Sequence, residues 1–177
     1  TYTTLTPTLV SGALTMVGAG GFAAVNLTGG NLTIAAGAGN SLTVAGGTLT
    51  TGVNRLIIDG TATLSGVLPV DATLGAIDVG GTGTLNLSAT TINVGAGGLN
   101  LATGSTFNTL NSSIVGIGAN QVGTVNASAG SVVTLNGITL NNVTFNNNTT
   151  VSQTGSVVLT NGAVFNNQLG ASYNLNS

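Results

Sequence analysis

The sequence predicts an all-β protein, with a parallel β-helix (β-solenoid) of short strands as the expected architecture. Short apolar or alternating runs, each closed by Gly or Asn, follow one another about every 8–12 residues, the spacing of short strands joined by tight turns. No stretch of about ten residues keeps a helical apolar period, and Gly, Thr, Val and Asn are poor helix formers. Similar segments recur at an irregular spacing of about 20–25 residues, which suits coils of two or three strands each.

Five runs in the first part of the chain show the strand pattern most clearly. In each run Leu, Ile or Val alternates with polar residues, so that one side of a strand is apolar. The Gly and Asn residues between runs supply the positive-φ conformations that tight turns need. The runs are residues 30–35, 40–45, 81–87, 91–94 and 98–101.

Two pairs of similar segments indicate the coil repeat. Residues 130–137 and 155–162 both begin Gly-Ser-Val-Val and end Asn-Gly, at an offset of 25. Residues 144–147 and 164–167 share Phe-Asn-Asn, at an offset of 20. We therefore expect each pair to occupy equivalent places in successive coils.

The near absence of charge is what a stacked architecture predicts. Only 2% of the 177 residues are charged, whereas ordinary domains are about a quarter charged. Stacked coils place equivalent side chains next to each other, so like charges are unfavourable. Inward Val, Leu and Ile are then expected to form apolar columns, and Asn at equivalent turns to form amide ladders.

Residues 1–10 are expected to form an edge strand of a single domain that spans 1–177. Pro7 cannot donate a hydrogen bond to a sheet, and Leu5, Pro7 and Leu9 alternate onto one side. An ordinary cap strand is the favoured interpretation, and a donor strand inserted into a neighbouring subunit is the alternative. A β-sandwich or jelly roll completed by donor-strand exchange fits the same strand spacing. The candidate subunit-contact residues are Tyr2, Leu5, Pro7, Leu9 and Val10.

The composition excludes most catalytic chemistry. The chain has no His, Lys, Glu or Cys, so a Ser nucleophile has no base and zinc has no imidazole or thiolate ligand. A single Arg is no basic surface for nucleic acid. Polar residues interrupt every apolar run, so no membrane span is expected. We predict that the chain is not an enzyme and binds no cofactor.

All four charged residues fall between positions 55 and 78. Asp59, Asp71 and Asp78 are weak candidates for a metal site, and the offset between Asp59 and Asp78 is close enough to one coil for them to stack on one side. The favoured interpretation is that Asp59 lies in a turn and Arg55 pairs with a nearby Asp at the surface. A polysaccharide-cleaving β-helix that uses these carboxylates is a remote alternative.

The short strands punctuated by Gly and Asn resemble the passenger segments of bacterial autotransporters and filamentous-haemagglutinin-like adhesins. This resemblance implies a right-handed parallel β-helix, export, and adhesion or matrix building. The first residue is Thr and the only Met is Met16, so we expect a secreted product from which a signal peptide was removed.

The function expected from the sequence is a structural subunit of an extracellular or cell-surface filament. A net charge of −2 favours association with copies of the same chain. A monomeric adhesin or binding module for cell-surface glycans or proteins is the alternative. Thr-rich faces also suggest ice binding as a function, but the Thr spacing along the sequence is not regular enough to favour this function.

Overall fold

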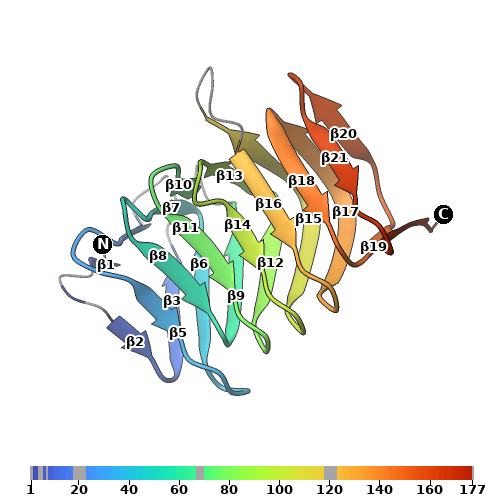
Figure 1. Cartoon of the computed structure of the whole chain (residues 1–177). Coiled ribbons are helices and arrows are strands. Elements are labelled where there is room, and N and C mark those ends of the chain that lie inside the picture. The colour runs from blue at the N-terminus through green and yellow to red at the C-terminus, as the bar shows by residue number, and fades with distance from the viewer. Residues whose placement is uncertain are drawn as a thin grey trace.

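The computed structural model describes residues 2–3, 6, 8–17, 23–66, 70–117 and 123–176. Within these residues the chain contains strands and turns but no helix. The coils follow one another along one axis, so the blue N-terminal end and the red C-terminal end lie at opposite ends of the stack (Figure 1). The strands of successive coils pair in parallel. The predicted β-solenoid is therefore confirmed, and the alternative of a β-sandwich or jelly roll completed by donor-strand exchange is wrong, because those folds are antiparallel.

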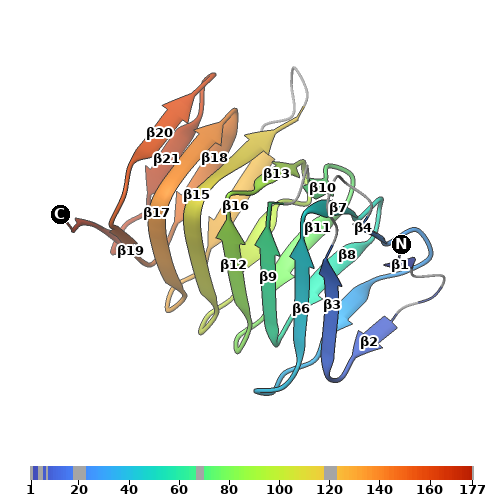
Figure 2. The ribbon, with the colours of Figure 1, turned by 180° about the vertical axis from the view of Figure 1, so that it is seen from behind.

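Three faces surround the core. An 8-stranded sheet makes one face, while a 14-stranded sheet bends along β15 (Thr106–Gly116) and β17 (Val132–Asn141) to make the other two (Figures 1 and 2). Face 1 holds β3 (Ala13–Val17), β6 (Ser41–Ala45), β9 (Thr61–Ser65), β12 (Thr84–Ser88), the first halves of β15 (Thr106–Gly116) and β17 (Val132–Asn141), β19 (Thr150–Gln153) and β22 (Ser172–Leu175). Face 2 holds β1 (Tyr2–Thr3), β4 (Ala23–Asn26), β7 (Gly47–Thr50), β10 (Val70–Ala72), β13 (Thr91–Val94), the second halves of β15 and β17, and β20 (Val157–Thr160). Face 3 holds β2 (Thr8–Val10), β5 (Leu32–Ile34), β8 (Arg55–Ile58), β11 (Ala76–Val79), β14 (Leu99–Leu101), β16 (Gly123–Ala127), β18 (Val143–Asn147) and β21 (Val164–Asn167).

The core consists of apolar columns that run along the axis. Alternate residues of each strand point inward, and parallel pairing places each inward residue on its equivalent in the next coil. Burial of each such side chain stabilises the fold by about 1.5–3 kcal/mol. One column on face 3 has six successive fully buried residues: Leu32, Leu56, Ile77, Leu99, Val125 and Phe145.

A column of left-handed residues makes the corner between faces 1 and 2. Successive coils turn this corner on one residue with positive φ, and the pairing of the strands before it stacks these residues on one another. Gly takes this conformation without the penalty that a Cβ atom brings. The column contains Gly46, Gly66, Ala89, Asn111 and Gly137.

The coil repeat differs in part from the sequence interpretation. The Phe-Asn-Asn repeat is confirmed, because Phe145 pairs with Phe165. The repeat at an offset of 25 is wrong as a coil repeat, because Val132 of the first segment lies on face 1 and Val157 of the second lies on face 2. Coil length varies because the corners differ in length: the coil that pairs Val132 with Thr150 is much shorter than the coil that pairs Ala13 with Ser41.

Exchanging Ala and Gly in the corner column is expected to change stability in opposite directions. Ala89 has φ 50° and is exposed, so Ala89→Gly relieves backbone strain with little loss of packing and should stabilise by about 1 kcal/mol. Gly66 has φ 54°, so Gly66→Ala should destabilise by about the same amount. Urea unfolding checks both variants, with Gly39→Ala as control because a Cβ there meets nothing within 4 Å. Changes of the same sign at both corner positions would contradict this account of the corner.

Candidate assembly interface

The last coil leaves an unpaired strand edge on each face. Among the described strands, β20 pairs only with β17, β21 only with β18 and β22 only with β19. Their outer edges therefore present main-chain donors and acceptors without a sheet partner, the arrangement that templates pairing with another chain.

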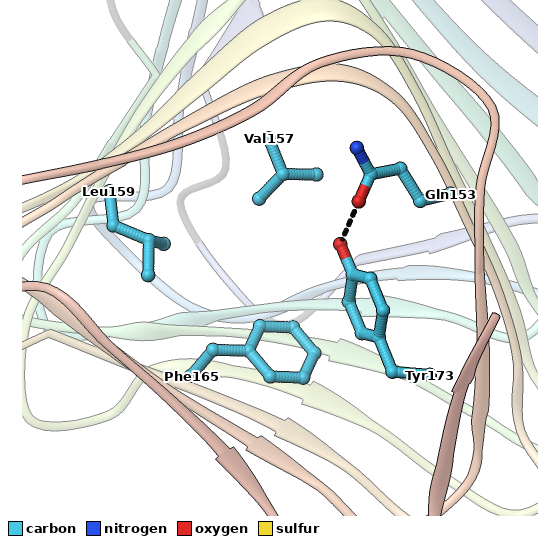
Figure 3. A pocket seen from close by; sticks show the side chains of 5 residues that line it. All are labelled: Gln153, Val157, Leu159, Phe165 and Tyr173. Carbon is cyan, nitrogen blue, oxygen red and sulfur yellow. Dashed lines mark hydrogen bonds between the residues drawn. The ribbon is translucent and has the colours of Figure 1, made fainter. Parts of the chain in front are cut away.

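An apolar pocket of about 300 Å³ opens at this end of the stack (Figure 3). Its walls continue the core columns: Leu159 lies on buried Leu140, and Phe165 lies on buried Phe145. Leu159 is 47% exposed although it belongs to a core column. The pocket is thus the uncovered end of the core. It is lined by Gln153, Val157, Leu159, Phe165 and Tyr173.

Aromatic contacts and two hydrogen bonds order the pocket. The Phe165 ring stacks on Phe145 with centroids 4.7 Å apart and meets Tyr173 edge-on at 4.9 Å. The Tyr173 hydroxyl donates to Gln153 Oε1 at 2.5 Å, as Figure 3 shows, and Gln153 Nε2 donates to the Gly155 carbonyl at 2.6 Å. Because these polar groups are already paired, the pocket offers mainly apolar surface to an occupant.

Burial raises the pKa of Tyr173 above its ordinary value of 10.0. The folded coil favours the neutral phenol, so its contribution to stability is fully present below about pH 10 and is lost as the pH rises through the folded-state pKa. We expect Tyr173→Phe to make the stability of the last coil less dependent on alkaline pH. Limited proteolysis of residues 150–176 between pH 9 and 11 measures this. If the proteolysis rate of this segment depended on pH equally in both proteins, the raised pKa of Tyr173 would not contribute to the stability of the last coil.

The first coil leaves matching edges at the opposite end. Among the described strands β1 pairs only with β4 and β2 only with β5, and β3 likewise ends its sheet beside β6. Of the predicted contact residues, Tyr2 and Val10 pack partly buried against the core, while Leu9 points outward and is 64% exposed. Leu5 and Pro7 lie outside the described residues.

The charged residues lie on separate parts of the surface. Arg55 and Asp78 form the predicted surface ion pair on face 3, and the carboxylate raises the pKa of Arg55 through its hydrogen bond and its charge. Asp71 on face 2 accepts hydrogen bonds from the main chain and hydroxyl of Thr73. Asp59 follows β8 at the corner between faces 3 and 1.

The predicted stacking of Asp59 and Asp78 is wrong. Asp78 pairs with Ile57 instead, because the coil between β8 and β11 is slightly longer than the separation of the two carboxylates along the chain. Across the part of the chain that the structure describes, no three of Asp, Glu, His or Cys form a group able to hold a metal ion.

An amide ladder runs along the outer side of face 3. Asn100 donates to Asp78 Oδ1, Asn126 donates to Asn100, Asn146 donates to Asn126, and Asn166 donates to Asn146, at 2.9, 2.9, 2.9 and 3.2 Å. Each of these residues pairs with its neighbour in strand register. The predicted ladder therefore occurs, but on strands rather than at turns.

Interrupting the ladder is expected to destabilise the middle coils. Asn126→Ala removes one hydrogen bond to each neighbouring coil, so the free energy of unfolding should fall by about 2 kcal/mol. Asn174→Ala is the matched control, because Asn174 is exposed on face 1 and outside the ladder. Urea unfolding compares the two, and an equal effect of both would show that the ladder adds no stability.

Strand register also aligns the outward residues of face 1, whose strands Figure 2 shows from outside. Neighbours in a column lie about 4.8 Å apart, and the columns about 6.6 Å apart. One column contains Ser41, Thr61, Thr84, Thr106, Val132 and Thr150. The next contains Thr15, Thr43, Thr63, Asn86, Asn108, Thr134 and Ser152. The spacing of the columns is regular even though the Thr spacing along the sequence is not, while Val132 interrupts the first column and Asn86 and Asn108 interrupt the second.

Comparison with known proteins gives no match to any family model, curated protein or solved structure. Among the described residues, no helix is long and apolar enough to cross a membrane.

Proposed function

We propose that this chain is a structural subunit of an extracellular filament, which self-assembles through β-strand contacts between the ends of its copies. The observation that carries this proposal is that no described residue covers the core columns and strand edges at either end of the stack. Covering them removes apolar surface from water and pairs the free main-chain groups.

The distribution of charge favours contact between ends. Natural proteins protect exposed strand edges with charged residues or Pro. Here all four charged residues lie between positions 55 and 78, and the two Pro residues are Pro7 and Pro69. Residues 123–176, which include the last coil, therefore have neither kind of protection, whereas the first coil includes Pro7.

The two ends are different surfaces at opposite ends of one axis (Figure 1). Contact between unlike ends is heterologous, and such contacts extend into open filaments when the rotation does not close a ring. In this proposal the filament is secreted and serves adhesion or matrix strength. Its main partners are copies of itself, with cell-surface glycans or proteins bound along its faces.

Electron microscopy of the purified protein in neutral buffer tests the proposal. The unmodified chain should form long, uniform filaments, and Leu159→Lys should prevent them, since the new ammonium would be buried unpaired at each junction. In the separate subunit this Lys stays solvated, because Leu159 is 47% exposed.

Val53→Lys is the matched control for that variant. It adds the same charge at a 75% exposed corner between β7 and β8, away from both ends. It should leave the filaments intact. Dispersed monomers of the unmodified chain at every concentration would overturn the filament proposal and favour a monomeric β-helical adhesin.

The aligned polar columns support a second candidate function, which we propose for face 1: binding to ice. The array is uncharged, because Arg55 and Asp78 lie on face 3, Asp71 on face 2 and Asp59 at a corner. Hydroxyl and methyl groups held at two fixed spacings on one flat face are a candidate surface for ordering water into a lattice.

Inhibition of ice recrystallisation measures this second function. The unmodified chain should inhibit it, and Thr63→Lys, in the middle of face 1, should abolish the effect by breaking the array. Thr48→Lys is the control, because Thr48 is a half-exposed outward residue of face 2. Inhibition that Thr63→Lys leaves unchanged, or no inhibition by the unmodified chain, would exclude ice as the ligand of face 1.

A further inference from the structure

We infer that the last coil receives the first coil of a second copy in face-matched register, with β1 on β20, β2 on β21 and β3 on β22. This inference rests on the proposed filament function and specifies its interface. It makes the junction between two copies equivalent to the contact between two coils of one copy.

The order of the faces supports this register. Along the chain, strands visit face 2, face 3 and face 1 in turn, beginning with β1, β2 and β3 and finishing with β20, β21 and β22. The position after β22 in this order is on face 2, where β1 of the second copy lies. The three faces therefore continue across the junction without a rotation of the incoming copy.

The core columns are complementary in the same register. Following the paired residues from coil to coil, Tyr2 and Leu159 share one column of face 2. Leu14 and Tyr173 share a column of face 1. These two columns thus continue with an apolar or aromatic side chain, whereas on face 3 Val10 follows Asn167. Tyr2 and Leu14 are only partly buried within one copy, so the junction completes their burial.

The column of Phe165 explains how the pocket is filled. Its continuation in the second copy is Thr8, a small residue. A small side chain over Phe165 leaves the pocket of about 300 Å³ for the larger ring of Tyr2, which enters from face 2. No charged residue lies in either terminal coil to oppose this contact.

Cysteine cross-linking tests the register directly. Leu9 and Asn166 point outward on face 3 and become direct neighbours across the junction, with Cα atoms about 4.8 Å apart, within disulfide range. The native chain has no Cys, so there is no background. Filaments of the double variant Leu9→Cys/Asn166→Cys should give a ladder of covalent oligomers on mild oxidation.

The control is Leu9→Cys/Asn174→Cys, which places the second thiol on exposed face 1. It should give no ladder. Filaments in which the control pair cross-links, or in which the Leu9→Cys/Asn166→Cys pair does not, overturn the register while leaving the filament function intact. Failure of the unmodified chain to assemble instead overturns the filament function, so the two failures are distinguishable.

A gain of assembly provides a second test. Asn166 Oδ1 ends the amide ladder and accepts no hydrogen bond from the described residues. Since each Asn of the ladder donates to the coil before it, Leu9→Asn should donate to Asn166 across the junction. One added hydrogen bond should lower the critical concentration for assembly about fivefold.

Leu9→Ser is the matched control for this gain, because it removes the same exposed Leu side chain without supplying an amide that can reach Asn166. Sedimentation measures the critical concentration of each variant. A critical concentration that is equal for Leu9→Asn and Leu9→Ser would contradict the register.

Discussion

Parallel main-chain pairing of successive coils is the constraint on which the rest of this structure depends. It stacks every side chain on its equivalent in the next coil, so one choice of residue type is repeated along a column. Stacked apolar residues stabilise the fold by burying one another, and stacked Asn residues stabilise it through the hydrogen bonds of the ladder from Asn100 to Asn166. Like charges would repel, which explains why the charged residues are few and why Arg55 faces Asp78.

The same constraint explains which features of the fold were predictable from the sequence. Strand texture and the Phe-Asn-Asn repeat identified the β-solenoid, because inward Phe145 and Phe165 must stack. The repeat of Gly-Ser-Val-Val predicts the wrong pairing, because the two segments lie on faces 1 and 2. Strands on different faces alternate apolar and polar residues in the same way, so their sequences look alike. Because the coils differ in length, the sequence does not show which residues of successive coils pair; that register depends on the length of each corner. For that reason the Thr columns of face 1 were not visible in the sequence.

The candidate interface was only half predictable. Pro7 and the alternation around it predict one edge strand over residues 1–10, but the structure has two short strands there, β1 and β2, which pair within the chain at the edges of two different sheets. Tyr2 and Val10 pack partly buried against the core. The opposite end was missed. The sequence feature that could have indicated this interface is that three of the six aromatic residues, Phe145, Phe165 and Tyr173, lie near the end of the chain. Whether those rings face inward depends on register, so the pocket beside Leu159 required the structure.

End-to-end continuity is the central claim, and the axial rise per subunit in filaments, measured by cryo-electron microscopy, tests it most directly. Face 3 holds eight strands, so seamless stacking gives a rise of about 38 Å per subunit, with coils about 4.8 Å apart across every junction. Such a rise with uninterrupted coils is the predicted result. A longer rise with a gap between globular beads, or subunits that meet side by side, would contradict it.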